Sequence, residues 1–168
     1  MAKIAAKYKV GVGADQYVRH MAELAAESDD ILKQSIYVGA GIVADEIRRG
    51  IAALPTVKSN AWGTPDKPIR GITVAQKMGL LDGLGIAHMD AENGVWNTKV
   101  GMDGYNIVQT KRWPDGQPNA MVLRSVESGT SFMRKIPVVA RSTAKSRPEA
   151  EKAMGERLDE LIAEKFGK

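Results

Sequence analysis

Few residues in this sequence could carry out chemistry. The chain contains no cysteine, which excludes thiolate catalysis, disulfides and cysteine-ligated zinc or iron–sulfur clusters. The two histidines, His20 and His88, lie far apart and do not have the spacing of metal ligands. A Ser-His-acid triad would have to use one of them, yet neither lies near a Gly-x-Ser-x-Gly turn. Both are therefore interpreted as ordinary surface or partly buried histidines.

Three short motifs resemble known sites, but each lacks a required residue. Gly11–Gly13 matches the start of a phosphate-binding loop, but Gln16 stands where the third glycine belongs. Asp103–Asn106 resembles the start of a calcium loop without the later ligands or the closing glutamate. Ser142–Lys145 matches Ser-x-x-Lys, but no Lys-Thr-Gly follows. The sequence therefore predicts no catalytic residue, no cofactor and no metal, and a protein that is not an enzyme.

Length and charge set broad limits. The chain has 168 residues, 43% of them apolar, which is enough for one domain with a sizeable core. Residues 128–148 contain no acid and five bases: Arg134, Lys135, Arg141, Lys145 and Arg147. This run is either a solvated basic face or a contact for nucleic acid or an acidic neighbouring subunit. No secretory signal or bilayer-spanning stretch is visible, so we expect a soluble protein without a membrane partner.

The strongest predicted helix runs from Ser28, as its N-cap, to Leu54 and ends before Pro55. Its apolar residues recur at steps of three and four and form one stripe: Leu32, Ile36, Ala40, Val43, Ile47, Ile51 and Leu54. The glycines at positions 39, 41 and 50 are interpreted as sites of close packing against a neighbouring element. A separate helix is predicted over 14–26, after an N-terminal arm of residues 1–13.

The middle of the chain reads as a loop, a short helix and a small sheet. Prolines and glycines predict a long loop from Pro55 to Gly71. Thr73 is expected to cap a short helix to about Leu81, and the glycines at 79, 83 and 85 are expected to break the helix and lead into strands. Asn93-Gly94 predicts a hairpin between strands within 86–90 and 95–102, and a third strand is predicted over 105–110. This antiparallel sheet of three to four strands is expected to pack on the 28–54 helix, which makes the predicted class α+β.

The tract from Pro118 to Ala140 is the most informative part of the sequence. Asn119 is the predicted N-cap of a short amphipathic helix that ends at Gly129. An apolar strand is predicted over 136–140. A last helix is predicted from Ser146 to Phe166, with a proline in its first turn.

Several strings, taken in order, resemble the tail-completion, or head–tail joining, proteins of long-tailed double-stranded DNA phages. They are Val43–Ile47, the hairpin region 96–106, Val126–Ser131 and Ile136–Arg141. The resemblance covers the chain from about Tyr17 to its end. It implies a structural virion protein with a small α+β fold and no catalytic residues to carry over.

The resemblance also implies the setting. The subunits would form a homo-oligomeric ring, with a hexamer expected, at the neck of the virion after assembly in the bacterial cytoplasm. The partners would be other copies of the chain, the head connector and stopper proteins and the major tail tube protein. Genomic DNA would pass through a central channel without sequence-specific binding.

Ring subunits need head-to-tail interfaces, and aromatic or basic residues in loops are natural anchors for them. The predicted interface residues are Trp62, Trp113, Arg134, Lys135 and Arg141. The alternative function is a small basic DNA-binding protein that uses the stretch from Arg134 to Arg147. A steep fall of affinity with salt would identify that function.

Overall fold

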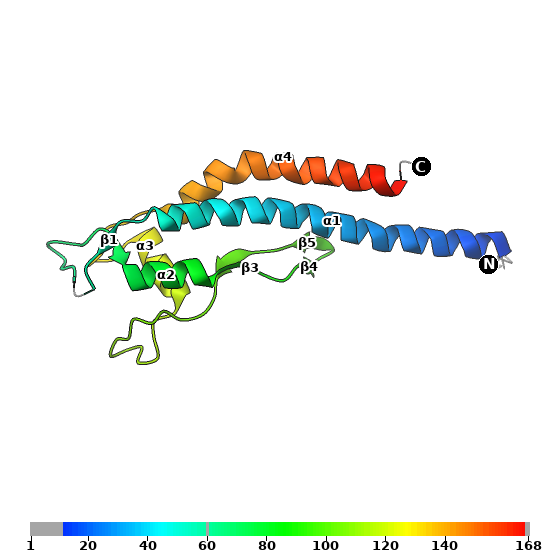
Figure 1. Ribbon diagram of the computed structural model, residues 1–168. Coiled ribbons are helices and arrows are strands. Elements are labelled where there is room, and N and C mark those ends of the chain that lie inside the picture. Colours follow the sequence, from blue (N-terminus) through cyan, green and yellow to red (C-terminus); the bar gives the residue numbers. More distant parts are fainter. Residues whose placement is uncertain (1–11, 60, 167–168) are drawn as a thin grey trace, which may run out of the picture.

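The computed structural model in Figure 1 describes residues 12–59 and 61–166. Two long helices lie side by side, and the short helices, strands and loops gather along one flank and at one end. The combination of helices with small sheets confirms the predicted α+β class. In chain order the elements are α1 (Val12–Ala52), β1 (Thr56–Val57), β2 (Ile72–Thr73), α2 (Val74–Gly83), β3 (Leu84–Ile86), β4 (Asp90–Glu92), β5 (Val95–Asn97), β6 (Val100–Met102), α3 (Asn119–Ser128) and α4 (Val138–Phe166).

Helix α1 is one continuous helix of 41 residues, so the prediction of two helices with an N-cap at Ser28 is wrong. No proline occurs within α1, and no glycine lies between Gly13 and Gly39. Compared with alanine, the serine and the two aspartates at 28–30 each destabilise a helix by about 0.7 kcal/mol at most. A capping residue begins a helix only where the preceding chain leaves the helical conformation. The predicted arm at residues 1–13 lies almost wholly outside the described residues.

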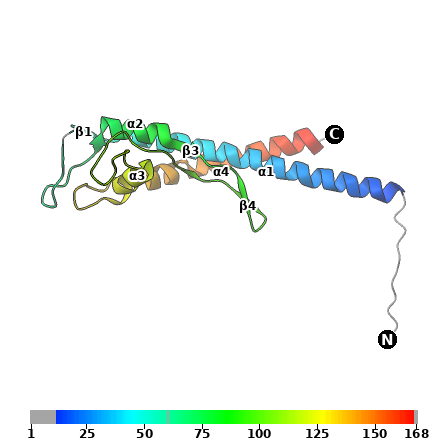
Figure 2. The same ribbon diagram turned by 90° about the horizontal axis from the view of Figure 1, so that it is seen from below.

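Helix α4 runs back along α1, and both views show the two helices side by side (Figures 1 and 2). A Cβ added at Gly39 would lie 2.6 Å from Met154, and one at Gly50 would lie 2.7 Å from Ser142 Oγ. These two glycines therefore allow the close packing that the sequence predicted. The partner was predicted wrongly, because α4 rather than a sheet covers most of α1. Beside Gly41 no atom lies within 4 Å of the added Cβ.

Polar contacts continue this pairing along the helices. Lys145 Nζ donates to Glu46 Oε1 at 2.6 Å, and near the other end Lys165 Nζ lies 3.7 Å from Glu27 Oε1. The hydrogen bond from Lys145 lowers the pKa of the buried Glu46 carboxyl below its usual value, and the charge of Arg49 acts in the same direction. Beyond Glu27 the N-terminal turns of α1 project past the end of α4 (Figure 1).

Helix α4 begins at Val138, so the predicted strand over 136–140 is wrong. The cause lies elsewhere in the chain. The Glu127 carboxylate, on α3, accepts hydrogen bonds from the amides of Val139 at 2.8 Å and Ala140 at 3.1 Å. Amides in the first turn of a helix have no partner within the helix, and a carboxylate there also favours the positive end of the helix dipole.

The predicted cap of this helix, Ser146, lies inside α4 instead. Its side chain is buried, and its hydroxyl donates to the Ser142 carbonyl at 2.8 Å. Pro148 likewise lies within the helix and not in its first turn. A proline inside a helix removes one backbone hydrogen bond, so the packing against α1 must stabilise this part of α4.

Over residues 12–59 and 61–166 the strands form three pairs, and the predicted sheet of three to four strands does not form. β1 and β2 are parallel, whereas β3 with β6 and β4 with β5 are antiparallel. Asn93 and Gly94 have φ of 53° and 77°, the left-handed values that a two-residue hairpin turn requires, so the predicted turn is confirmed. The predicted third strand over 105–110 is wrong, because this segment makes only isolated bridges to Pro118 and Trp113.

Trp96 attaches the β4–β5 hairpin to α1. Its indole Nε1 donates to Asp29 at 2.9 Å, and the Lys33 ammonium lies 4.1 Å from the centre of its ring. The hairpin therefore lies beside the middle of α1, as Figure 1 shows.

The core lies where the C-terminal half of α1 meets α2, α3 and the first turns of α4. It contains nine buried apolar residues: Ile47, Ile51, Leu54, Ile72, Leu80, Leu84, Val122, Val126 and Val138. Thr73 caps α2 as predicted, since its Oγ1 accepts from the Gln76 amide at 3.1 Å while Gln76 Oε1 accepts from the Thr73 amide at 3.0 Å.

Candidate assembly surfaces

The loop after β1 and the segment before α4 are held together by backbone hydrogen bonds. The Ile69 amide donates to the Phe132 carbonyl at 3.0 Å, and the Arg134 amide donates to the Ile69 carbonyl at 2.8 Å. A Cβ at Gly63 would lie 1.8 Å from the Phe132 carbonyl oxygen, so only glycine fits there. We call residues 61–70 and 130–135 the basic tip. Sequence patterns do not reveal this pairing, because its two parts lie about 60 residues apart and neither is a regular strand.

The basic tip exposes two large aromatic side chains and a concentration of positive charge. Trp62 is 77% exposed and Phe132 is 55% exposed, and both line a hollow of about 290 Å³. The tip has one acid, Asp66, and four exposed bases: Lys67, Arg70, Arg134 and Lys135. Exposed aromatic rings beside charges that have no ion-pair partner among the described residues are typical of a surface that binds another macromolecule.

The structure brings together three of the five predicted interface residues. Trp62, Arg134 and Lys135 all belong to the basic tip. Arg141 is exposed on the first turns of α4. Trp113 belongs to the loop over 108–118, and Figure 1 shows this loop apart from the loop that contains Trp62. The Trp113 side chain is half-buried, and the Arg112 guanidinium lies 5.7 Å from the centre of its ring.

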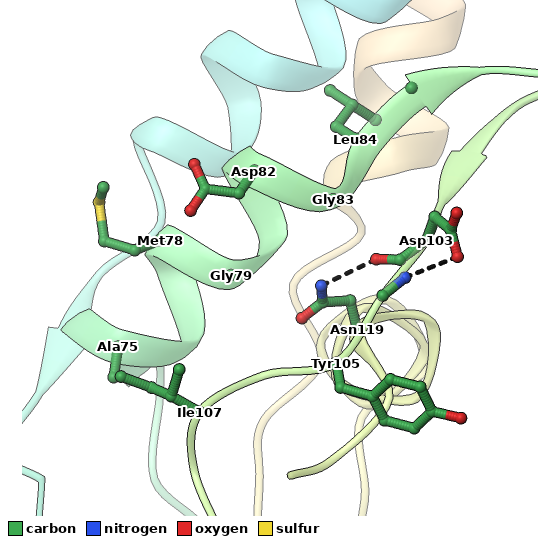
Figure 3. Close-up of a pocket in the computed structure, with 12 residues that line it drawn as sticks. Ala75, Met78, Gly79, Asp82, Gly83, Leu84, Asp103, Tyr105, Ile107 and Asn119 are labelled. Atoms are coloured by element: carbon green, nitrogen blue, oxygen red, sulfur yellow. Dashed lines mark hydrogen bonds between the residues drawn. The ribbon is translucent and has the colours of Figure 1, made fainter. Parts of the chain in front are cut away.

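A second hollow, of about 580 Å³, lies between α2 and residues 103–107 (Figure 3). Met78 lines it from the helix, and Tyr105 and Ile107 line it from the loop. All three side chains are largely exposed, with 81% of Ile107 accessible. Sequence patterns did not reveal this surface, because the predicted third strand placed Tyr105 and Ile107 in a sheet.

Two buried asparagines, Asn106 and Asn119, hold the residues beside this hollow in place, and Asn119 also lines it. Asn119 Nδ2 donates to the Asp103 carbonyl at 2.9 Å, so Asn119 does not cap α3 as predicted, and no side chain caps that helix. Asn106 Nδ2 donates to the Gln76 carbonyl at 3.2 Å, and Asn106 Oδ1 accepts from the Val108 amide. A buried amide must satisfy its polar atoms, and this requirement turns Asn106 inward and bends the chain where a strand was predicted.

Gly79 and Gly83 lie within α2 and do not end it at Leu81 as predicted. They are four residues apart and so share one helix face. A Cβ at Gly79 would lie 2.5 Å from Asn106 Nδ2, and one at Gly83 would lie 2.3 Å from the Asp103 carbonyl oxygen. These glycines therefore let the 103–119 segment pack against α2.

The residues first considered for chemistry have structural roles or lie outside the described part. His88 is exposed, with Nδ1 2.8 Å from its neighbour's carbonyl oxygen. Lys145 of the Ser-x-x-Lys motif pairs with Glu46. Asp103 Oδ1 accepts from the Gly104 amide at 2.7 Å, which is a turn contact. Gly11 and the side chain of His20 are not described. Among the residues that are described, no three His, Asp or Glu side chains gather as metal ligands would.

Comparisons with protein-family models, with curated proteins and with solved structures find no match to this chain. Over the described ranges, no helix is both long and apolar enough to span a bilayer.

Proposed function

We propose that this protein is a structural virion component that completes the joint between head and tail in a long-tailed phage. One observation carries the proposal. The two strings that resemble the tail-completion family, Val126–Ser131 and Ile136–Arg141, flank the second part of the basic tip and overlap it at residues 130–131, and between them Phe132 is exposed in the same hollow as Trp62. A tract that positions large exposed side chains suits a protein that acts through contacts with other proteins.

In this proposal the subunits form a ring, with a hexamer expected, at the virion neck. The ring binds the head connector and stopper proteins on one side and the tail tube protein on the other. It leaves a channel through which the genome passes without sequence-specific contact. The subunit performs no catalysis, and its assembly takes place in the bacterial cytoplasm.

A phage with a stop codon in this gene provides the test. We expect DNA-filled heads and separate tails to accumulate in electron micrographs, and purified protein added to that lysate to restore infectious particles. Normal joined particles without the protein would refute the proposal.

Trp62→Ala should reduce the restored titre about tenfold or more, because a single aromatic anchor often contributes about 2 kcal/mol or more to an interface.

Val95→Ala is a matched control for the tryptophan variant. Val95 is 64% exposed on the β4–β5 hairpin, away from the basic tip. The Val95→Ala protein should therefore restore the same titre as the wild-type protein. Equal titres for the two variants would exclude Trp62 as an anchor while leaving the role of the whole protein intact.

DNA binding through the Arg134–Arg147 stretch is the second candidate, and the observation behind it is the positive charge of the basic tip. Ion pairs weaken this candidate, because Lys145 contacts Glu46 at 2.6 Å and Arg147 contacts Glu151 at 2.8 Å. Each phosphate contact makes the logarithm of affinity fall by about 0.9 per unit of log salt. No retention of duplex DNA at low salt would eliminate the candidate.

A further inference from the structure

The outward face of α4 beyond its proline is acidic. Glu149, Glu156, Glu160 and Glu164 follow one another at intervals of seven, four and four residues, so they lie on one side of the helix, and all are exposed. Residues 149–166 contain six acids and three bases in total. We call this surface the acidic face.

The bases of this segment are already engaged. Lys152 Nζ lies 3.6 Å from Glu156 Oε1, and Arg157 Nη1 lies 3.2 Å from Glu160 Oε2. Lys165 reaches across to Glu27 on α1. Within the described ranges three acids of the segment have no cationic partner: Glu149, Asp159 and Glu164. A net negative field therefore remains along the end of α4.

The basic tip has the opposite character. Over the described residues none of its four bases, Lys67, Arg70, Arg134 and Lys135, forms an ion pair with a carboxylate. Figure 1 shows the tip at one end of the elongated molecule, whereas α4 runs away from it toward the other end. The distance between these two surfaces prevents them from meeting within one subunit, but they can meet between two copies.

We propose that the basic tip of one subunit docks on the acidic face of α4 in the next subunit, with Trp62 and Phe132 as the aromatic anchors of the contact. This proposal rests on the proposed ring and names the surfaces that would form it. A contact between two different surfaces of identical chains is heterologous, and it closes into a ring when the rotation between neighbours allows. Complementary charges would orient the subunits, and the aromatic rings would provide apolar area to bury.

The apolar rings favour a protein occupant over duplex DNA at the tip. Phosphate contacts require bases and polar groups, and do not require a tryptophan and a phenylalanine to be exposed beside them. On the acidic face Glu149 and Glu164 have no cationic partner within the described ranges, so their carboxylates can pair with bases of the tip.

Charge reversal tests the contact on the full chain. Arg70→Glu with Arg134→Glu reverses the tip, and Glu156→Lys with Glu160→Lys reverses the face. Sedimentation velocity measures self-association at about 0.05 M salt, where surface charges are screened weakly, and at up to about 1 mM protein, which detects a dissociation constant as weak as about 1 mM. Each reversal should weaken association about tenfold or more. Circular dichroism confirms that each variant is folded.

Recombination of the charges gives the sharper readout. An equimolar mixture of the two reversed chains, or one chain with all four substitutions, should associate nearly as well as wild type. Lys99→Glu with Arg124→Glu is the matched control, since it changes the net charge as much as the tip reversal does at exposed residues outside the tip. This control should associate within about threefold of wild type.

Three results would overturn the proposal: wild type that stays monomeric under these conditions, reversed variants that behave like the control, or a mixture that fails to recover. If tip reversal abolishes retention on DNA without changing self-association, the tip is instead a nucleic-acid surface.

Failure of this contact is distinguishable from failure of the proposed function. If the chain with the reversed acidic face restores the full phage titre, the contact is refuted but the joining role is not. If the wild-type protein restores no titre, the joining role itself is refuted.

Discussion

We call the core, where the C-terminal half of α1 meets α2, α3 and the first turns of α4, the helical junction. The junction and the basic tip are adjacent along the chain at α3, yet they are stabilised in different ways. At the junction Ile51, Leu80 and Val126 have no exposed surface. The tip begins a few residues after Val126, and two backbone hydrogen bonds hold its two segments together while Trp62 and Phe132 remain accessible. Burial determines the shape of the junction, whereas the tip keeps its largest side chains available for a partner.

The tryptophans repeat this contrast. Trp96 is half-buried and donates to Asp29, so it attaches a hairpin to α1. Trp62 is 77% exposed in the basic tip. A large aromatic side chain can therefore stabilise the subunit or serve a docking surface, and residue type alone does not distinguish the two roles.

The largest effect should come from the junction. Ile51→Ala removes buried methyl and methylene groups from the fully enclosed core and should lower the free energy of unfolding by about 2–5 kcal/mol in urea denaturation. Ile107→Ala is the control, since Ile107 is 81% exposed and its truncation should change stability by less than about 0.5 kcal/mol. Equal effects would contradict the division into a buried junction and an exposed surface.

A smaller loss should follow from Glu127→Ala, which removes the acceptor of two amides at the start of α4. Loss of a helix cap costs about 1 kcal/mol, and thermal unfolding should show it. Glu92→Ala, at an exposed position on β4, should leave the melting temperature unchanged. If Glu127→Ala unfolds at the wild-type temperature, the link between the α3 carboxylate and α4 does not stabilise the junction.

The smallest global effect should come from Gly63→Ala. The added Cβ would overlap the Phe132 carbonyl, so the two segments of the tip must separate. Amide exchange of Ile69 and Arg134 should accelerate, while the global free energy of unfolding changes by about 0.5 kcal/mol or less. Gly41→Ala, with no atom within 4 Å of the new Cβ, should leave exchange in the tip unchanged. Global unfolding of the Gly63 variant would show that the tip belongs to the core.

Patterns of local origin were predicted well. The Asn93-Gly94 turn, the Thr73 cap and the stop at Gly129 depend on a few adjacent residues, and all three are confirmed. The α+β class and the packing roles of Gly39 and Gly50 were likewise predictable, because helical periodicity and interior glycines are local signals.

The errors occurred where distant residues decide the local structure. The residues at 136–140 resemble a strand, but α4 begins within them at Val138, where the Glu127 carboxylate accepts from the amides of the first turn. The segment over 105–110 has strand-forming side chains, but burial of Asn106 beneath α2 bends it. For the candidate site, the sequence predicted interface roles for Trp62, Arg134 and Lys135, but it did not show that these residues are neighbours in the structure.

The sequence by itself determined the positions of turns, glycines and charges, because these depend on the chemistry of adjacent residues. It also specified an acidic end and a basic stretch on one chain. Only the tertiary structure decided that α4 covers α1, that residues 61–70 pair with 130–135, and that the opposite charges lie at opposite ends. The physical reason is that each of these arrangements depends on burial or hydrogen bonding between segments that are distant in sequence, and these terms have no local signature.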